Sequence, residues 1–260
     1  MTDTAAHELS VEQRSALVDL LYRLADDDLV LGHRCSEWTG LGPILEADIA
    51  FSSMAQDLMG HAWTLYNLLH ELGEANPDAI AFARSLEQYR CCSMVSLANG
   101  DWAFSTIRQF LYAEAKQVRL TALADSTYAP LAEVARKLRG EVKYHTMHGR
   151  MWVTRLGAGT NESHTRLHEA LQELYPHALG MFEPTKCDAA IAAEQIGPSE
   201  VSLLEQWRTA IQPTLNEAGL PVPKTAEPLY GGRIGRHPAE LARLLQDMHK
   251  VFRLDPAAVW

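Results

Sequence analysis

Long stretches of apolar residues at helical spacing constrain this 260-residue chain more than any other feature. Apolar positions at i, i+3, i+4 and i+7 predict a helix with one buried face, and no convincing alternating strand pattern appears. Several of these segments run for about 25–30 residues, well beyond the usual helix length. Long helices joined by short loops pack as antiparallel bundles. The sequence therefore predicts an all-α bundle. Two of the stripes are Met54, Leu58, His61, Leu65, Leu68 and Leu72, and Leu131, Leu138, Val142, His145, Trp152 and Leu156.

Capping residues and Gly or Pro signals place the ends of eight predicted helices. The first should begin at the Ser-x-x-Gln capping box of Ser10 and end near Cys35. The others are expected from 42 to about 73, from 76 to before 99, from 101 to about 125, from 129 to about 159, from 160, from 197 to 219, and from 237. The Pro- and Gly-rich stretch between Gly219 and His237 is expected to lack regular structure.

Bulk composition excludes some classes of function. The formal net charge of −10 and a pI of about 5.5 argue against non-specific nucleic-acid binding, which needs a basic footprint. No apolar run reaches the ~20 residues of a membrane span, and residues 1–12 carry no signal-peptide core. The four cysteines form no Cys-x-x-Cys pair. We therefore expect a cytoplasmic protein with reduced thiols, at Cys35, Cys91, Cys92 and Cys187.

Two histidines lie on the apolar stripes in frames that resemble half of a di-iron site. Di-iron carboxylate bundles use a Glu-x-x-His pair on each of two helices and one Glu from each of the other two. In this chain Leu58 precedes His61 by three residues, and Val142 precedes His145 in the same way. Leu and Val cannot bind a metal. The spacing therefore indicates an oxygenase-like scaffold without two of its ligands.

Carboxylates near the same stripes are the remaining candidates. Asp28 and Glu114 fall on or near the stripes of the first and fourth predicted helices, where each could supply a single carboxylate. Asp57 and Glu141 precede the two histidines by four residues, so each could share a metal with the histidine of its own helix. We favour buried polar networks or salt bridges for both, because the apolar stripe passes through Leu58 and Val142 instead.

Simple core packing of two histidines, without inherited metal geometry, remains an open alternative. We expect no catalytic, cofactor-binding or metal-binding residue in this chain. The candidates for a vestigial site are Asp28, His61, Glu114, Glu141 and His145.

A second motif, Gly231-Gly232-Arg233-Ile234-Gly235, is glycine-rich but follows no predicted strand. A nucleotide-binding loop is therefore a poor interpretation. A flexible turn and a contact of Arg233 or Arg236 with a partner or a phosphate both remain open.

Across nearly its full length the chain resembles the C subunits of phenylacetyl-CoA epoxidase complexes. The matching stretches lie in order along the sequence, and the most specific of them is the tail at 231–237. They are 24–32, 36–38, 48–50, 56–60, 99–101, 108–111, 141–145, 155–157 and 231–237.

The resemblance implies one ferritin-like domain over residues 1–260, with a core bundle at about 10–182 and additional C-terminal helices at about 197–260. In that family the di-iron centre lies in the A-type subunit, and the C-type subunit is its structural paralogue without a working metal site. The implied role is a non-catalytic subunit of a monooxygenase complex for phenylacetate degradation. The implied partners are the A-type subunit, a reductase and further subunits of the complex. A homodimer of the isolated chain is left open. The alternatives are an active di-iron oxygenase and a ferritin-like metal-binding protein.

Overall fold

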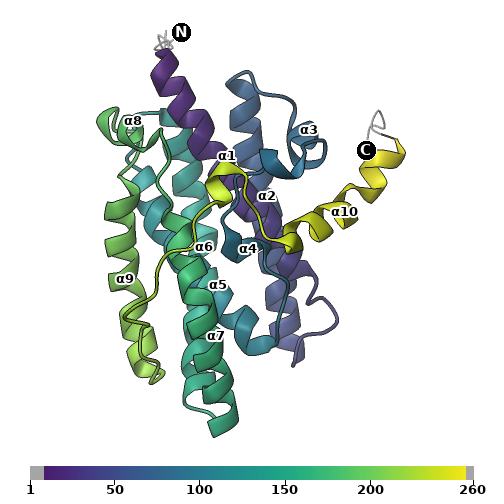
Figure 1. Ribbon diagram of the computed structural model, residues 1–260, viewed down its shortest axis with the longest axis vertical. Coiled ribbons are helices and arrows are strands. Elements are labelled where there is room, and N and C mark those ends of the chain that lie inside the picture. Colours follow the sequence, from purple (N-terminus) through teal and green to yellow (C-terminus); the bar gives the residue numbers. More distant parts are fainter. Residues whose placement is uncertain (1–8, 256–260) are drawn as a thin grey trace.

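Four long antiparallel helices build the centre of the molecule (Figure 1). The computed structural model describes residues 9–255. The four helices are α1 (Val11–Ser36), α2 (Leu45–Glu71), α5 (Trp102–Leu123) and α6 (Ala129–Gly157). Helix α1 packs mainly on α2, α5 packs mainly on α6, and α2 also contacts α6. The described residues contain no strand, so the predicted all-α bundle is confirmed.

Later helices cover this bundle on one side. Helices α7 (Asn161–Leu179) and α9 (Glu200–Glu217) pack against α5, and the short α8 (Asp188–Ala193) packs against α1. Helix α10 (Ala239–Leu254) contacts the 77–96 segment and extends away from the bundle (Figure 1). Within residues 9–255 no helix has the length and hydropathy needed to cross a membrane.

Side-chain caps explain why several helices begin where the sequence predicted. Ser10 and Gln13 form the expected reciprocal capping box at the start of α1. The Asp101 carboxylate accepts the backbone N–H of Phe104 and so begins α5. Thr160 caps α7 in the same way. These local interactions satisfy N–H groups that have no partner inside the helix.

The predicted single helix from 76 to 99 is wrong. That segment contains α3 (Pro77–Phe82), a 3₁₀ turn η1 (Leu86–Gln88) and α4 (Ser93–Ser96), separated by extended residues. The backbone N–H of Arg90 donates to Asp26 at 2.6 Å, and that of Cys92 donates to Asp27 at 2.7 Å. Because these N–H groups bind carboxylates of α1, they do not form helical hydrogen bonds. Burial against α1 therefore overrides local helix propensity.

The stretch between Gly219 and His237 lacks α-helix and strand, as the sequence predicted. It contains a 3₁₀ turn, η3 (Gly232–Ile234), flanked by Gly231 at φ +131° and Gly235 at φ +82°. Such angles strain residues that carry a Cβ, so glycine is required at both positions. The Arg233 guanidinium is buried and donates to both oxygens of Asp27, at 2.9 and 2.8 Å.

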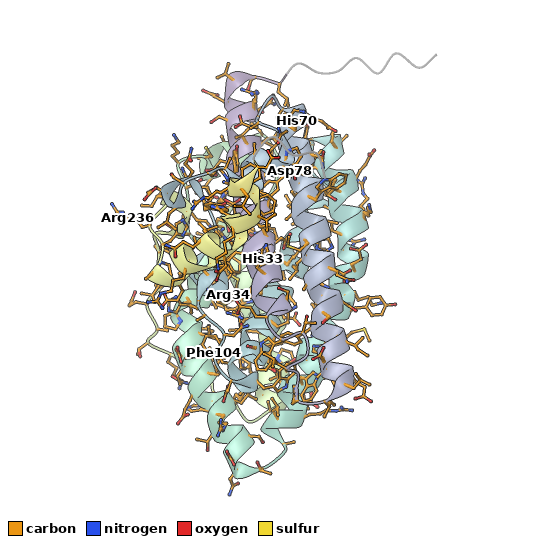
Figure 2. All side chains as sticks on the ribbon, turned by 90° about the vertical axis from the view of Figure 1, so that its right-hand side faces the viewer. His33, Arg34, His70, Asp78, Phe104 and Arg236 are labelled. Atoms are coloured by element: carbon orange, nitrogen blue, oxygen red, sulfur yellow. The ribbon has the colours of Figure 1, made fainter. Side chains whose placement is uncertain are left out.

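Arg233 also donates to three backbone carbonyls, those of Arg23, Arg90 and Met181. It therefore links α1, the 77–96 segment and the 3₁₀ turn η2 (Gly180–Phe182) that follows α7, and these contacts occupy it instead of a partner or a phosphate. Arg236, three residues later, is exposed at the surface (Figure 2).

A second buried ion network joins α1, α5 and α9. Glu200 accepts from Arg23 at 2.9 Å and from both terminal nitrogens of Arg119 at 2.6 Å. Burial alone would raise the pKa of Glu200, but the two guanidinium groups together hold that pKa below its usual value. The network positions α9 across α5 by charge as well as by apolar packing.

This lowered pKa has a consequence for stability. A carboxyl whose pKa is depressed by folding stabilises the protein above its unfolded pKa of about 4.3, and the contribution is lost as the pH falls through the folded value. We expect Glu200→Gln to lower the free energy of unfolding by about 1.5–3 kcal/mol at pH 7. The difference from the wild type should shrink below about pH 4.3.

Urea titrations between pH 7 and pH 3 measure both effects. The control is Glu205→Gln on the same helix, because Glu205 is exposed and forms only a surface ion pair with Arg208. If Glu200→Gln lowered the free energy of unfolding by the same amount at every pH, this account of Glu200 would be wrong.

Candidate functional site

The two predicted histidines meet inside the bundle. His61 extends from α2 and His145 from α6, and each is only 1% exposed. Their ring centroids are 6.2 Å apart, with the planes inclined by 30°. Leu58 and Val142, which occupy the positions of ligand glutamates, are fully buried beside them. The apolar stripes therefore placed both histidines correctly in the core.

The two neighbouring carboxylates pair across the helices. Glu141 of α6 binds Nε2 of His61 at 2.6 Å, and Asp57 of α2 binds Nε2 of His145 at 3.0 Å. Both carboxylates are partly exposed, so each dyad runs from the surface of the α2–α6 pair into its interior. The favoured interpretation, a polar network, agrees with this geometry. The same-helix pairs considered as metal ligands are not formed.

A buried lysine stands between Asp28 and His61. The Lys116 ammonium of α5 lies 2.6 Å from Oδ1 of Asp28 and 2.6 Å from Nδ1 of His61. Tyr112, one turn earlier, donates its hydroxyl to Asp28 at 2.7 Å. Asp28 and His61 are thus brought together, as predicted, but through a cation from a third helix.

Hydrogen-bond chemistry fixes the protonation of His61. Burial lowers the pKa of Lys116, and the charge and hydrogen bond of Asp28 oppose that shift and favour the ammonium. An ammonium has only donors, so Nδ1 of His61 accepts from Lys116 in this state. The proton of the neutral ring is then on Nε2, which donates to Glu141. Burial lowers the pKa of His61 strongly, and the Lys116 charge lowers it further. The imidazole is therefore neutral at pH 7.

The second candidate carboxylate is also engaged. Glu114 is 1% exposed, and Arg150 of α6 binds both of its oxygens, at 2.5 and 2.7 Å. The neighbouring Gly149 permits this close approach of α6 to α5. A Cβ at position 149 would come within 2.9 Å of the Phe110 backbone. The bidentate pair satisfies a carboxylate that would otherwise be buried without a partner.

These residues do not fit a di-iron centre. Residues 9–255 contain no group of three or more His, Cys, Asp or Glu side chains arranged to hold a metal ion. The donor atoms of Asp28, His61 and Glu114 already bind Lys116 or Arg150. Sequence reasoning considered histidines and carboxylates and so missed both cations. The available signal was the position of Lys116. It follows Tyr112 by four residues, so the two side chains lie on the same face of α5, and that face is buried.

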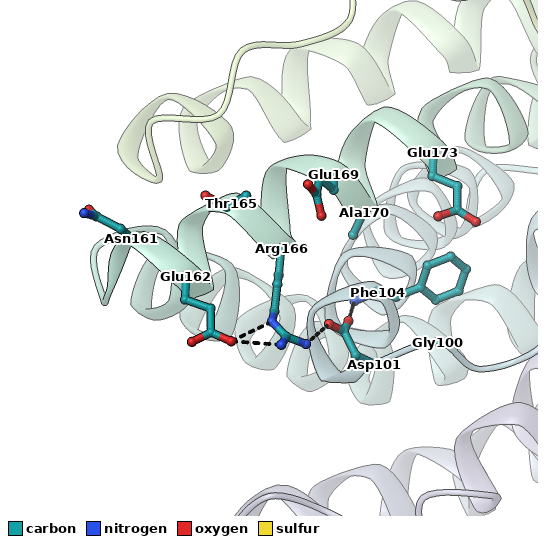
Figure 3. Close-up of a pocket in the computed structure, with 10 residues that line it drawn as sticks. All are labelled: Gly100, Asp101, Phe104, Asn161, Glu162, Thr165, Arg166, Glu169, Ala170 and Glu173. Atoms are coloured by element: carbon teal, nitrogen blue, oxygen red, sulfur yellow. Dashed lines mark hydrogen bonds and ion pairs between the residues drawn. The ribbon is translucent and has the colours of Figure 1, made fainter.

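A groove lies elsewhere, between the start of α5 and α7 (Figure 3). Its volume is about 690 Å³, and its lining includes the carboxylates of Asp101, Glu162, Glu169 and Glu173. Arg166, in the middle, is bound by Glu162 at 2.8 Å and by Asp101 at 3.1 Å. An acidic lining repels phosphates, so this groove is unsuited to the nucleotide end of an acyl-CoA.

The chain is similar in sequence to known proteins. The chain is 33% identical, over 240 residues, to the C subunit of the 1,2-phenylacetyl-CoA epoxidase of Escherichia coli (strain K12). That match covers 92% of this chain and 96% of the relative. It is also 24% identical over 160 residues to the A subunit of the same enzyme, which covers 61% of this chain and 51% of the relative. The family model described as phenylacetic acid catabolic protein matches residues 1–260. The chain therefore belongs to the family of phenylacetic acid catabolic proteins.

Proposed function

We propose that this chain is the non-catalytic structural subunit of a multicomponent phenylacetyl-CoA epoxidase in the cytoplasm. In that complex it binds and stabilises a paralogous A-type subunit, which carries the di-iron centre, while a reductase subunit supplies electrons. The similarity to the C subunit of the Escherichia coli enzyme, over almost the whole length of both chains, supports the assignment. The observation that carries the non-catalytic role is the Lys116 ammonium between Asp28 and His61.

The two alternatives are an active di-iron oxygenase and a ferritin-like metal-binding protein. Either would need free carboxylates at the centre of the bundle. Asp28 and Glu114 are instead neutralised by Lys116 and Arg150. No contact at this centre, within the part of the chain that the structure describes, favours the alternatives over the structural role.

The outer face of the α2–α6 pair is our choice for the docking surface. This α2–α6 flank is defined by four exposed side chains: Trp63, Tyr144, Met147 and Met151. Trp63 is 62% exposed and Tyr144 is 72% exposed, which are large fractions for aromatic residues. Aromatic and Met side chains are enriched in the centres of protein interfaces. Both aromatic residues lie off the core stripes, where a partner can reach them.

Charge argues for the kind of partner. Helix α6 carries six Lys or Arg residues against two Glu, although the chain as a whole has a net charge of −10. One of the two, Glu141, is bound to His61. A basic helix with exposed aromatic and Met side chains favours an acidic, partly apolar surface. We infer that the A-type subunit presents such a surface and that the paralogous folds pair about a pseudo-two-fold axis.

Tyr144→Asp should weaken the affinity for the A-type subunit by at least ten-fold, because it places a carboxylate among apolar contacts and opposite the acidic surface inferred for the partner. Isothermal titration with the purified A-type subunit measures the effect. The matched control is Val201→Asp, because Val201 is an apolar residue that is 64% exposed on a different helix, α9. Equal affinities for the two variants would overturn the choice of surface. Sedimentation of the isolated chain detects a homodimer, and loss of that homodimer in Tyr144→Asp would assign it to the same flank.

The structural role itself has a separate test. Epoxidation of phenylacetyl-CoA by the A-type subunit, together with its reductase, should require this chain. Full turnover by those two components without it would show that the structural role is wrong.

A further inference from the structure

Two carboxylate–histidine dyads, Glu141 with His61 and Asp57 with His145, lie at the centre of the bundle. A histidine that binds a metal through one ring nitrogen usually donates its other N–H to a carboxylate. His61 and His145 each bind a carboxylate through Nε2, Glu141 and Asp57 respectively. In the first dyad the opposite nitrogen, Nδ1, faces a positive charge, the Lys116 ammonium. The carboxylate that would orient a metal-binding histidine is therefore present. Lys116 occupies the position next to Nδ1 where a metal ion would bind.

We propose that Lys116 and Arg150 are built-in replacements for metal ions and that they exclude metal from this bundle. Buried carboxylates need a counter-charge, which a metal or a side-chain cation can supply. Lys116 lies 2.6 Å from both a carboxylate oxygen and an imidazole nitrogen, the two donor types that divalent transition metals accept. An ion and the ammonium cannot occupy that position together. Arg150 of α6 neutralises Glu114 of α5 in the same way.

Metal exclusion rests on the same Lys116 contacts as the proposed non-catalytic role, but it is a property of the isolated chain and does not depend on how the chain assembles with an A-type subunit. Its failure would leave the docking proposal standing, and failure of docking would leave the two cations in place. The two proposals are therefore tested separately, the first by metal binding and the second by association.

The probe is Co²⁺ added to the purified chain, followed by its visible absorption and by equilibrium dialysis. Lys116→Ala should bind Co²⁺ at least ten-fold more tightly than the wild type, because Asp28 and Nδ1 of His61 become free. Adding His61→Gln to that variant should remove the gain. The matched control is Lys143→Ala on α6, since Lys143 is exposed, and it should behave as the wild type.

A measurement on the wild type tests the proposal even if the Lys116→Ala variant does not fold. Nitrogen-15 chemical shifts should report a neutral His61 with its proton on Nε2 and an unprotonated Nδ1. A proton on Nδ1 would overturn the lysine contact. Stoichiometric metal in the wild type that His61→Gln releases would overturn the proposal, as would a folded Lys116→Ala with no gain in Co²⁺ affinity.

Discussion

Replacing Arg233 by alanine is expected to lower the free energy of unfolding by about 3–5 kcal/mol. The guanidinium is 4% exposed, binds both oxygens of Asp27 and donates to three backbone carbonyls. Its removal leaves a buried carboxylate without its counter-charge and three carbonyls with fewer partners. The 231–235 segment should also lose its attachment to α1. Urea denaturation followed by circular dichroism measures the change.

Arg236 provides a matched control in the same segment. It is exposed, so Arg236→Ala should change stability by less than about 0.5 kcal/mol. The pair also separates the two interpretations that the motif allowed from sequence. If Arg233→Ala were as stable as Arg236→Ala, Arg233 would not hold the 231–235 segment against α1. Contact of Arg233 with a partner would then be the better interpretation.

Lys116→Met is expected to be nearly as damaging, with a loss of about 3–5 kcal/mol. The methionine fills similar space but leaves Asp28, which is 1% exposed, with only the Tyr112 hydroxyl. Neutralising the partner should reverse much of the loss. We therefore expect the double variant with Asp28→Asn to be more stable than Lys116→Met alone, because the buried charge has gone.

The four proteins of this double-mutant cycle are compared at pH 7 by urea denaturation. Lys143→Met serves as the control for an exposed lysine and should have little effect. Simple additivity of the two single changes would contradict an ion pair between Lys116 and Asp28.

The parts of the fold that depend on neighbouring residues in the sequence were predictable. Apolar stripes and caps such as Ser10 and Asp101 placed the four long helices, because these signals act within one or two turns. The segment from 76 to 99 was not predictable in this way. Its extended residues are held by Asp26 and Asp27, about 65 positions earlier in the chain, and no local pattern reveals those contacts.

The candidate site was predictable in part for the same reason. The stripes placed His61 and His145 in the core, but the pairing of each with the carboxylate of the other helix depends on how α2 and α6 pack. Lys116 was missed because a lysine is usually exposed, and only the neighbouring Asp28 makes its burial tolerable. The absence of a metal from this chain stays a prediction.

The central claim is that this chain supports catalysis without taking part in it. The most direct measurement is phenylacetyl-CoA turnover by the reconstituted complex when this chain carries His61→Gln and His145→Gln together. The account predicts that an assembled complex keeps its rate within about two-fold, since neither histidine stabilises a transition state. Loss of turnover by a complex that remains assembled, with the wild-type chain restoring it, would contradict the account.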